Sequence, residues 1–368
     1  MCERIDNTTT EIPFRLPLYH LCPAATREAT NTYITPSGAA YLSSHGDLLK
    51  QPLPSTIDTA WIVVHGSAHN ADDYLCGAQG TLLALDDPAK INTTVILTPW
   101  FLPAYDETSS ISQTQRRSSS DLQQGLRWLE HGPIAHTWRY GANAVNSTVS
   151  SYAVLDELVQ MVLDQQQPKI QHIIVAGHSA GGQVVQRWSL LTPHTVPFRA
   201  VVGNPKSLCW LDNRRYCAST NTSTSLMLRV PDADAIAVCP TYNEWEWGWE
   251  ASQANHREGG RPLIAPYVDR MIATAGGVDA IVERYATRDV VYLAGELDVL
   301  WNGDCEARMQ GDCRLRRSEN FFKSLREIYG RQVHRRFVVS GVHHDHCLMF
   351  QSPEGRFALF GDHSAVKF

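Results

Sequence analysis

The stretch Gly177 to Gly182 constrains this chain most. It reads G-H-S-A-G-G and directly follows the apolar, β-branched run from His172 to Ala176. A strand that ends in Gly, followed by Ser and a helix start of small residues, is the strand–turn–helix context of a nucleophile. Bulky neighbours would clash in so sharp a turn, and the amides of the following helix face any developing negative charge. The motif predicts a reactive Ser179, against the alternative of a Gly-rich turn without chemistry.

Apolar strand-like runs alternate with helical patterns along the chain. We expect strands at 59–64, 94–97, 172–176, 199–203, 290–294 and 336–339. We expect helices from 70 onward, from 150 to before Pro168, over 180–192 and over 318–329. This alternation predicts a mainly parallel α/β sheet flanked by helices.

Two segments interrupt the alternation. Residues 104–149 are rich in Ser, Thr and Gln and predict a long irregular excursion. Residues 204–288 are dense in Trp and Tyr, and we interpret them as a cap or insertion. The expected organisation is therefore an N-terminal segment with leading strands (1–54), a core made of 55–203 and 289–368, and the cap at 204–288.

A serine nucleophile needs a base, and the base needs an acid that orients it. Candidates follow two expected strands, where parallel sheets place their sites. Asp298 comes after the strand 290–294, with Glu296 as the alternative acid. His344 comes after the strand 336–339, with His343 and His346 as the alternative bases. The order Ser179, Asp298, His344 matches the Ser, Asp or Glu, His order of one fold.

With these residues, the chain resembles the α/β-hydrolase superfamily in its esterase- and lipase-like branch, over most of 55–362. In that superfamily the catalytic His commonly lies in a Gly-x-x-His-Asp turn after the last strand, which residues 341–345 match with His344. The resemblance implies an oxyanion hole from the amides of Ala180 and Ser67, with Ala68 next to Ser67. The chain has His-Gly-Ser-Ala there rather than His-Gly-Gly-Gly, which leaves the second amide open.

The resemblance implies a serine hydrolase that cleaves a carboxylic ester through an acyl-enzyme, with no metal or organic cofactor. A lactonase, a peptidase or amidase, an acyltransferase and a non-catalytic ligand-binding protein on the same fold stay open, because a fold does not fix a function. We expect a small-molecule ester as substrate. His178, Trp245 and Trp247 are candidates for the substrate pocket, since aromatic rings pack well on apolar ligands.

Metal ions and nucleic acids are less favoured partners. The net charge of −6 lacks the basic footprint of a nucleic-acid-binding protein. The run His343 to Cys347 lacks the H-E-x-x-H spacing of a zinc hydrolase. The acidic residues from Asp304 to Asp312 suggest a solvated loop, with a Ca²⁺ site as the open alternative. No apolar run is long enough to span a bilayer, and the sequence leaves the oligomeric state open.

The compartment is predicted from sequons and cysteines. Glycosylation sequons begin at Asn7, Asn92, Asn146 and Asn221. Nine cysteines include three close pairs that could form disulfides, Cys2/Cys22, Cys209/Cys217 and Cys305/Cys313. The N-terminus shows no apolar signal-peptide core, so we interpret the chain as a mature secreted protein whose signal peptide is replaced by Met1. A cytoplasmic protein with reduced thiols is the alternative.

Overall fold

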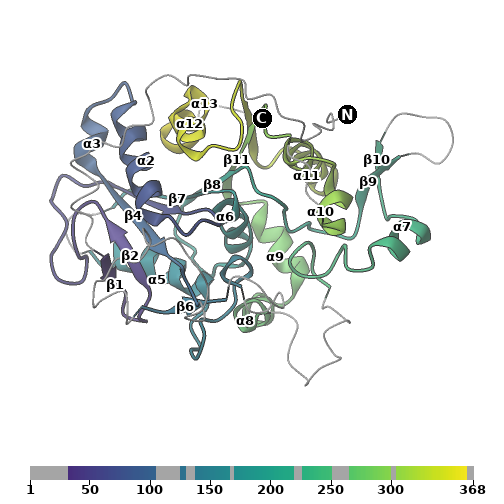
Figure 1. The fold of residues 1–368 in the computed structure, drawn as a ribbon, viewed down its shortest axis with the longest axis horizontal. Coiled ribbons are helices and arrows are strands. Elements are labelled where there is room, and N and C mark those ends of the chain that lie inside the picture. The colour runs from purple at the N-terminus through teal and green to yellow at the C-terminus, as the bar shows by residue number, and fades with distance from the viewer. Residues whose placement is uncertain are drawn as a thin grey trace, which may run out of the picture.

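An eight-stranded sheet forms the centre of the protein in the computed structural model (Figure 1). The structure describes residues 32–104, 125–129, 137–165, 170–218, 226–250, 265–299 and 304–362. The sheet strands are β1 (Thr32–Ile34), β2 (Ala40–Ser43), β3 (Thr59–Val64), β4 (Thr94–Trp100), β7 (His172–His178), β8 (Arg199–Gly203), β11 (Asp289–Gly295) and β12 (Arg335–Val339). Their order is β1-β2-β4-β3-β7-β8-β11-β12.

The sheet is mainly parallel, as predicted. β1 pairs antiparallel with β2, and β2 antiparallel with β4. The other six strands, from β4 to β12, run parallel to one another. Their carboxyl ends therefore meet at one edge of the sheet. All six strands expected from the sequence are present, with β4 extending three residues beyond its expected end.

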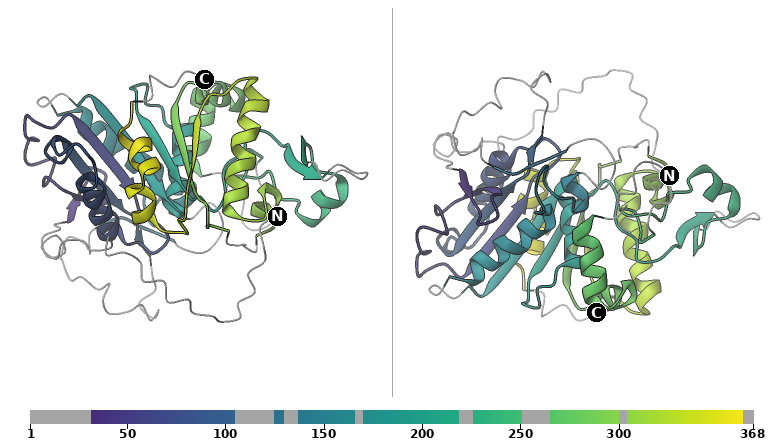
Figure 2. Two further views of the ribbon diagram at one scale, coloured as in Figure 1. Left: turned by 90° about the horizontal axis from the view of Figure 1, so that it is seen from above. Right: turned by 90° about the horizontal axis from the view of Figure 1, so that it is seen from below.

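Helices cover both faces of the sheet (Figure 2). One face packs against α5 (Ser151–Leu163), α6 (Ala180–Leu191), α8 (Pro266–Ala275), α9 (Val278–Tyr285) and α11 (Arg314–Tyr329). The other packs against α2 (Ala71–Leu83), α12 (His346–Gln351) and α13 (Pro353–Phe360). Strand side chains alternate between the two clusters, so that Ile62 joins the first cluster whereas Trp61 and Val63 join the second. Burial on both faces explains why these strands are almost continuously apolar.

The expected helices are present with small differences. Ser150 caps α5 by accepting a hydrogen bond from the Tyr152 amide. α11 begins at Arg314, four residues before the expected start. The remaining elements are α3 (Ala89–Thr93), β5 (Leu102–Pro103), β6 (Arg127–Trp128), the 3₁₀ turn η3 (Trp138–Tyr140), β9 (Arg215–Ala218), β10 (Leu226–Arg229), α7 (Ala233–Val238) and α10 (Cys305–Gln310). Among the described helices, none combines the length and apolar character needed to cross a membrane.

The predicted cap segment 204–288 contains two kinds of structure. The hairpin β9–β10 and α7 project from one end of the molecule (Figures 1 and 2). By contrast, α8 and α9 contribute Tyr267, Val268 and Ile281 to the main core cluster. The division of the chain into core and cap stays a prediction. Much of the predicted excursion at 104–149 lies outside the described residues.

The cysteines pair differently from two of the predicted local pairs. Cys239, which follows α7, forms a disulfide with Cys305 at the start of α10. Cys209 and Cys217 are both free thiols, so the predicted pair between them is wrong. Cys209 is buried in the core cluster while Cys217 lies on the projecting hairpin. The pair Cys305/Cys313 is also wrong, because Cys305 bonds to Cys239. Cys2 and Cys22 lie outside the described residues.

Candidate active site

Ser179 lies in the turn between β7 and α6, in a backbone conformation that few residues other than Gly adopt. Its φ is 59° and its ψ is −118°. The turn is held by a 2.9 Å hydrogen bond from the Ser179 amide to the carbonyl oxygen of Gly203, on the neighbouring β8. Ser179 thereby projects at the edge where the carboxyl ends of the parallel strands meet.

Small residues around Ser179 are a steric requirement. A Cβ on Gly177 would lie 2.4 Å from the backbone of Gly181, and one on Gly181 only 2.2 Å from the Val64 carbonyl oxygen. A Cβ on Gly182 would lie 2.4 Å from the carbonyl oxygen of Gly203. Each distance is far below van der Waals contact with backbone atoms that cannot swing aside. The three glycines therefore allow α6 to start directly against β3 and β8.

The structure brings Ser179, His344 and Asp298 into contact. His344 follows β12, and its Nε2 lies 2.8 Å from the Ser179 Oγ. Its Nδ1 lies 2.7 Å from Oδ2 of Asp298, which follows β11. Asp298 is 1% exposed, whereas the imidazole of His344 is 24% exposed. A hydroxyl bonded to one imidazole nitrogen and a buried carboxylate bonded to the other is the geometry needed to activate a serine.

The alternative acid and bases lie elsewhere in the same turn. The exposed Glu296 accepts hydrogen bonds from the Ser340 hydroxyl and the Gly341 amide, and these bonds lower the pKa of its carboxyl. His343 is exposed, with Nδ1 3.2 Å from the Leu297 carbonyl oxygen. His346 stacks on Tyr74, with ring centroids 4.0 Å apart. The contacts with Ser179 described above therefore involve none of the three.

The loop after β3 lies against Ser179. A Cβ on Gly66 would be 3.8 Å from the Ser179 Cβ. His65 fixes this loop, because its Nε2 accepts from the Phe101 amide and its Nδ1 donates to the Gly66 carbonyl oxygen. Ser67 follows as an exposed turn residue. Ala180 is the first residue of α6, where an amide has no partner within the helix. The two predicted oxyanion donors thus flank Ser179 from β3 and α6.

Two contacts around the site were missed by sequence reasoning. Arg314, the first residue of α11, pairs with the second carboxylate oxygen of Asp298 at 3.2 Å. Asn204 follows β8 with a φ of 40° and connects neighbouring loops. Its Oδ1 accepts from the Gly295 amide at 2.8 Å, and its Nδ2 donates to the His343 carbonyl oxygen at 3.2 Å. Its position directly after a strand was the available signal, whereas Arg314 gave none.

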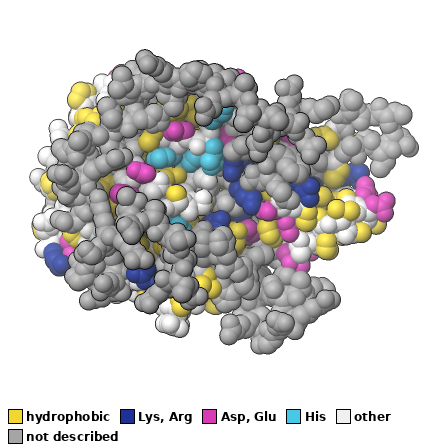
Figure 3. All heavy atoms as spheres, viewed as in Figure 1, with side chains coloured by type: hydrophobic (Ala, Val, Ile, Leu, Met, Phe, Trp, Pro, Cys, Tyr) yellow, Lys and Arg dark blue, Asp and Glu magenta, His cyan; other side chains and the backbone are white. Residues whose placement is uncertain are grey.

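His178, a predicted pocket residue, is buried beside the base rather than open to solvent. Its ring centroid lies 4.5 Å from that of His344. The Asn204 Nδ2 lies 3.4 Å from Nε2, and the Tyr74 hydroxyl lies 3.3 Å from Nδ1. Burial, then the nearby His344, His346 and Arg314, hold the pKa of His178 well below its usual range. A neutral His178 therefore packs beneath His344. Figure 3 shows histidines gathered near the centre of one face, with basic side chains beside them.

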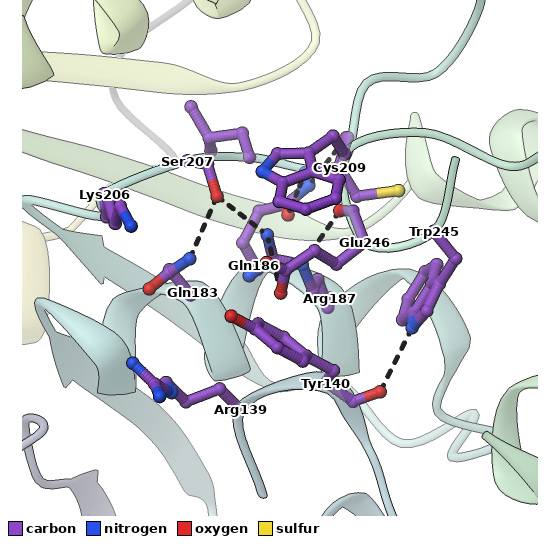
Figure 4. A network of polar contacts seen from close by, with 12 residues as sticks. Arg139, Tyr140, Gln183, Gln186, Arg187, Lys206, Ser207, Cys209, Trp245 and Glu246 are labelled. Carbon is purple, nitrogen blue, oxygen red and sulfur yellow. Dashed lines mark hydrogen bonds and ion pairs between the residues drawn. The ribbon is translucent and has the colours of Figure 1, made fainter. Parts of the chain in front are cut away.

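The predicted pocket residues Trp245 and Trp247 are also buried, at 1% and 8% exposure. Trp245 donates from Nε1 to the carbonyl oxygen of Tyr140 at 3.2 Å (Figure 4). Both side chains are thus packed inside the protein in this structure. Their role in a substrate pocket stays a prediction.

Between these tryptophans, Glu246 faces α6. Arg187 of α6 is fully buried, and its Nη2 lies 3.7 Å from the Glu246 carboxylate. The same guanidinium donates to the Glu246 carbonyl oxygen and to the Ser207 hydroxyl, which also accepts from Gln183 (Figure 4). Burial raises the pKa of Glu246 to about 7, against the opposing effect of Arg187. This network fixes the loop at 239–250 to the helix that begins at Ala180.

The acidic residues from Asp304 to Asp312 do not converge on one point. Asp304 forms an ion pair with Lys206, and Glu306 accepts a hydrogen bond of 2.5 Å from the Thr241 hydroxyl. Asp312 lies between α10 and α11. In the described part of this segment, the carboxylates with known contacts are engaged by protein groups.

Comparisons with known proteins agree with the fold. No family model matches the chain, and no curated protein matches its sequence. Among solved structures, poly(aspartic acid) hydrolase-1 from Sphingomonas sp. KT-1 is similar with a TM-score of 0.52, at 17% identity over 88% of this chain and 96% of that one. LpqC, a poly(3-hydroxybutyrate) depolymerase from Bordetella parapertussis, has a TM-score of 0.52 at 15% identity over 89% of each chain. The chain therefore has the α/β-hydrolase fold.

Proposed function

We propose that this chain, with its α/β-hydrolase fold, is a serine hydrolase that cleaves a carboxylic ester. The observation that carries the proposal is the pair of hydrogen bonds through His344, 2.8 Å to the Ser179 hydroxyl and 2.7 Å to the Asp298 carboxylate. Fold likeness at 15–17% identity does not transfer a substrate, so the proposal rests on these side chains.

In the first step, His344 Nε2 takes the proton of Ser179 as Oγ attacks the ester carbonyl carbon. The tetrahedral oxyanion would be held by the amides of Ala180 and Ser67. As the bond to the alcohol breaks, His344 returns the proton to the leaving oxygen, and Ser179 carries the acyl group. Water, deprotonated by His344, then releases the acid and restores the Ser179 hydroxyl.

Asp298 supports both steps from beneath the imidazole. Its Oδ2 accepts the Nδ1 proton of His344, which leaves Nε2 as the basic nitrogen and stabilises the imidazolium that forms. Arg314 binds Oδ1 of the same carboxylate and so restrains its rotation. Both carboxylate oxygens of Asp298 are therefore engaged, which orients His344 toward Ser179.

A fluorophosphonate probe tests the proposal, because it labels only a serine that an adjacent base activates. Intact mass and peptide mapping should find one adduct, on Ser179, and no adduct on Ser179→Ala. A panel of esters, lactones and amides should then show turnover of esters by the native chain alone. A folded, monodisperse sample that gains no adduct would refute the activated serine. Turnover of amides without esters would instead refute the ester class.

We further propose that the protein is a secreted glycoprotein. Asn92 and Asn146, which begin two of the sequons, are exposed on the surface. The Cys239–Cys305 disulfide is typical of proteins from oxidising compartments. When a eukaryotic host secretes the chain, glycosidase treatment should lower its mass, and Asn92→Gln with Asn146→Gln should reduce that change. A chain of unmodified mass at both sites would count against the proposal.

A further inference from the structure

Three consecutive side chains next to the proposed base form a second cluster of reactive groups. Asp345, His346 and Cys347 stand at the start of α12, and their ligand atoms all lie within 4.8 Å of one another. All three are partly exposed, so solvent reaches the cluster. We propose that they bind one divalent cation of the Zn²⁺ class, at a site distinct from Ser179.

The spacing of the ligand atoms fits one ion. The Cys347 Sγ lies 3.3 Å from the Nε2 of His346. In a tetrahedral zinc site, bonds of 2.0–2.1 Å to nitrogen and 2.3 Å to sulfur place those two atoms about 3.6 Å apart. A shift of a few tenths of an ångström therefore opens the pair to a shared ion. Asp345 supplies a third ligand, and water completes the four positions, as in open zinc sites.

Gly77 of α2 leaves the space that the ligand atoms occupy. A Cβ at this position would lie 3.0 Å from the Cys347 Sγ and 3.2 Å from the His346 Nε2. Any other residue would press on both donor atoms at once. The opposite wall is Tyr74, whose ring is stacked on His346 with an interplanar angle of 7°. The imidazole is therefore held in one orientation before an ion arrives, which lowers the cost of binding.

The chemistry and charge of the cluster favour the same cation. Imidazole and thiolate suit zinc-class ions, whereas Mg²⁺ and Ca²⁺ prefer oxygen alone. Burial and the negative charges of Asp345 and Asp73 raise the pKa of the Cys347 thiol to about 12. The carboxylates that disfavour a bare thiolate attract a cation. Binding would release the thiol proton to water as the metal–sulfur bond forms.

The other cluster of metal-binding residue types in the described part of the chain offers no such site. It consists of Cys239, Cys305 and Glu306. Its two cysteines are joined in the disulfide, so neither sulfur can become a thiolate ligand.

Occupation of the site should slow hydrolysis, a consequence that rests on the proposed function, whereas binding itself does not. Asp345 directly follows His344 and caps α12 through a 2.9 Å bond from the Leu348 amide. An ion that recruits this carboxylate pulls on the peptide next to the base. A second connection runs from His346 through Tyr74 to His178, which packs against His344.

The test titrates the full, disulfide-intact chain with Co²⁺, a spectroscopic substitute for Zn²⁺. We expect one equivalent to bind with a thiolate-to-cobalt charge-transfer band, and Zn²⁺ to remove that band by competition. Cys347→Ser should abolish the band. His346→Gln should weaken Co²⁺ binding by at least about 10-fold, since even partners outside the ligand shell contribute about 10–100-fold. Cys217→Ser, at a free and partly exposed thiol on β9, is the matched control and should behave as wild type.

Absence of the band in the wild type, or its persistence in Cys347→Ser, would overturn the site. Far-UV circular dichroism and fluorophosphonate labelling of Ser179 verify that each variant is folded. Zn²⁺ should also lower ester turnover by the wild type and by Cys217→Ser, but not by Cys347→Ser. Binding without this inhibition would refute the coupling to His344. A wild type without any ester turnover would refute the proposed function, while the cobalt spectrum would still decide the site.

Discussion

Ser179 keeps its unusual backbone angles because three neighbouring positions carry no side chain. Gly177, Gly181 and Gly182 each face backbone atoms of a neighbouring strand, turn or helix at distances that exclude a Cβ. At this scale the sequence was informative, because a local turn is encoded by local residues. Arg314 and Asn204 were missed for the opposite reason. Their contacts depend on where strands separated by many residues end, which single residue types do not reveal.

Alanine substitution of one of these glycines should disrupt the turn. Gly181→Ala places a methyl group 2.2 Å from the Val64 carbonyl oxygen, and backbone on both sides blocks relief. Overpacking a core costs about 1–3 kcal/mol and occasionally more, so we expect a loss of about 3 kcal/mol or more in the free energy of unfolding. Urea denaturation measures it.

Gly80→Ala in α2 is the matched control for that experiment. Its Cβ would meet only the side-chain amide of Gln351, at 2.9 Å, which can move aside. Replacing Gly by Ala in a helix gains up to about 1 kcal/mol. The stability of Gly80→Ala should therefore stay within about 1 kcal/mol of wild type. Equal losses in the two variants would contradict the steric argument.

The two candidate acids can be separated by isosteric amides. Asp298→Asn removes the carboxylate that fixes the Nδ1 proton of His344, so we expect kcat for an ester to fall by roughly 10⁴-fold. Glu296→Gln keeps an oxygen acceptor for Ser340 and Gly341 and should leave kcat essentially unchanged. Steady-state kinetics on both variants measures the difference. The reverse pattern would move the role of the acid to Glu296.

At the scale of elements, strands were predicted better than helices. Strand runs such as that of β7 are apolar on both faces, and this signal is strong in any window of sequence. The start of α11 was predicted late because its first turn is rich in Arg. Yet Arg317 is fully buried and donates to the carbonyl oxygens of Gly311 and Lys206. Charge therefore concealed a buried helix start. Likewise, α8 and α9 were hidden in a segment whose aromatic density indicated a cap.

His334 joins three elements and should make stability depend on pH. Its Nε2 donates to the Tyr285 carbonyl oxygen of α9 at 2.9 Å, and its Nδ1 accepts from the Tyr292 hydroxyl of β11 at 3.3 Å. These partners suit the neutral imidazole, and burial lowers the pKa of His334 from 6.5 to about 4. Because the folded pKa lies below the unfolded one, the stabilisation is complete above pH 6.5 and is lost as the pH falls toward 4.

The substitution His334→Gln tests this dependence. The amide can make the same two hydrogen bonds but does not titrate. Between pH 7 and pH 4, the free energy of unfolding of the wild type should fall by up to about 3 kcal/mol more than that of the variant. Urea denaturation at intervals across this range measures the two curves. Parallel curves would show that His334 does not contribute to acid sensitivity.

At the scale of the whole molecule, the Cys239–Cys305 disulfide ties the region of α7 to the region of α10. The two cysteines are 66 residues apart in sequence. No spacing rule could have predicted the pair, because the cysteines nearest to each other along the chain are not nearest in space. The predicted local pairs failed for this reason.

Removing the disulfide should destabilise the protein through its unfolded state. Closing a loop of 66 residues is expected to contribute about 4 kcal/mol in the chain-entropy model. The double variant Cys239→Ser, Cys305→Ser should lose a free energy of unfolding of this order in urea denaturation. Cys217→Ser removes a thiol without a disulfide and serves as control. A double variant as stable as this control would show that α7 and α10 are held by other contacts.

The order of the strands along the chain also bears on how the protein is made. β12 is the last strand of the sheet, and only after it does the chain supply His344. During synthesis, a nascent chain that has emerged through β11 can already place Ser179 beside β8, yet it has no base to activate it. Every incomplete product of translation that stops before residue 344 is therefore inert as the proposed hydrolase. The cell that makes this protein meets its reactivity only when nearly the whole polypeptide exists.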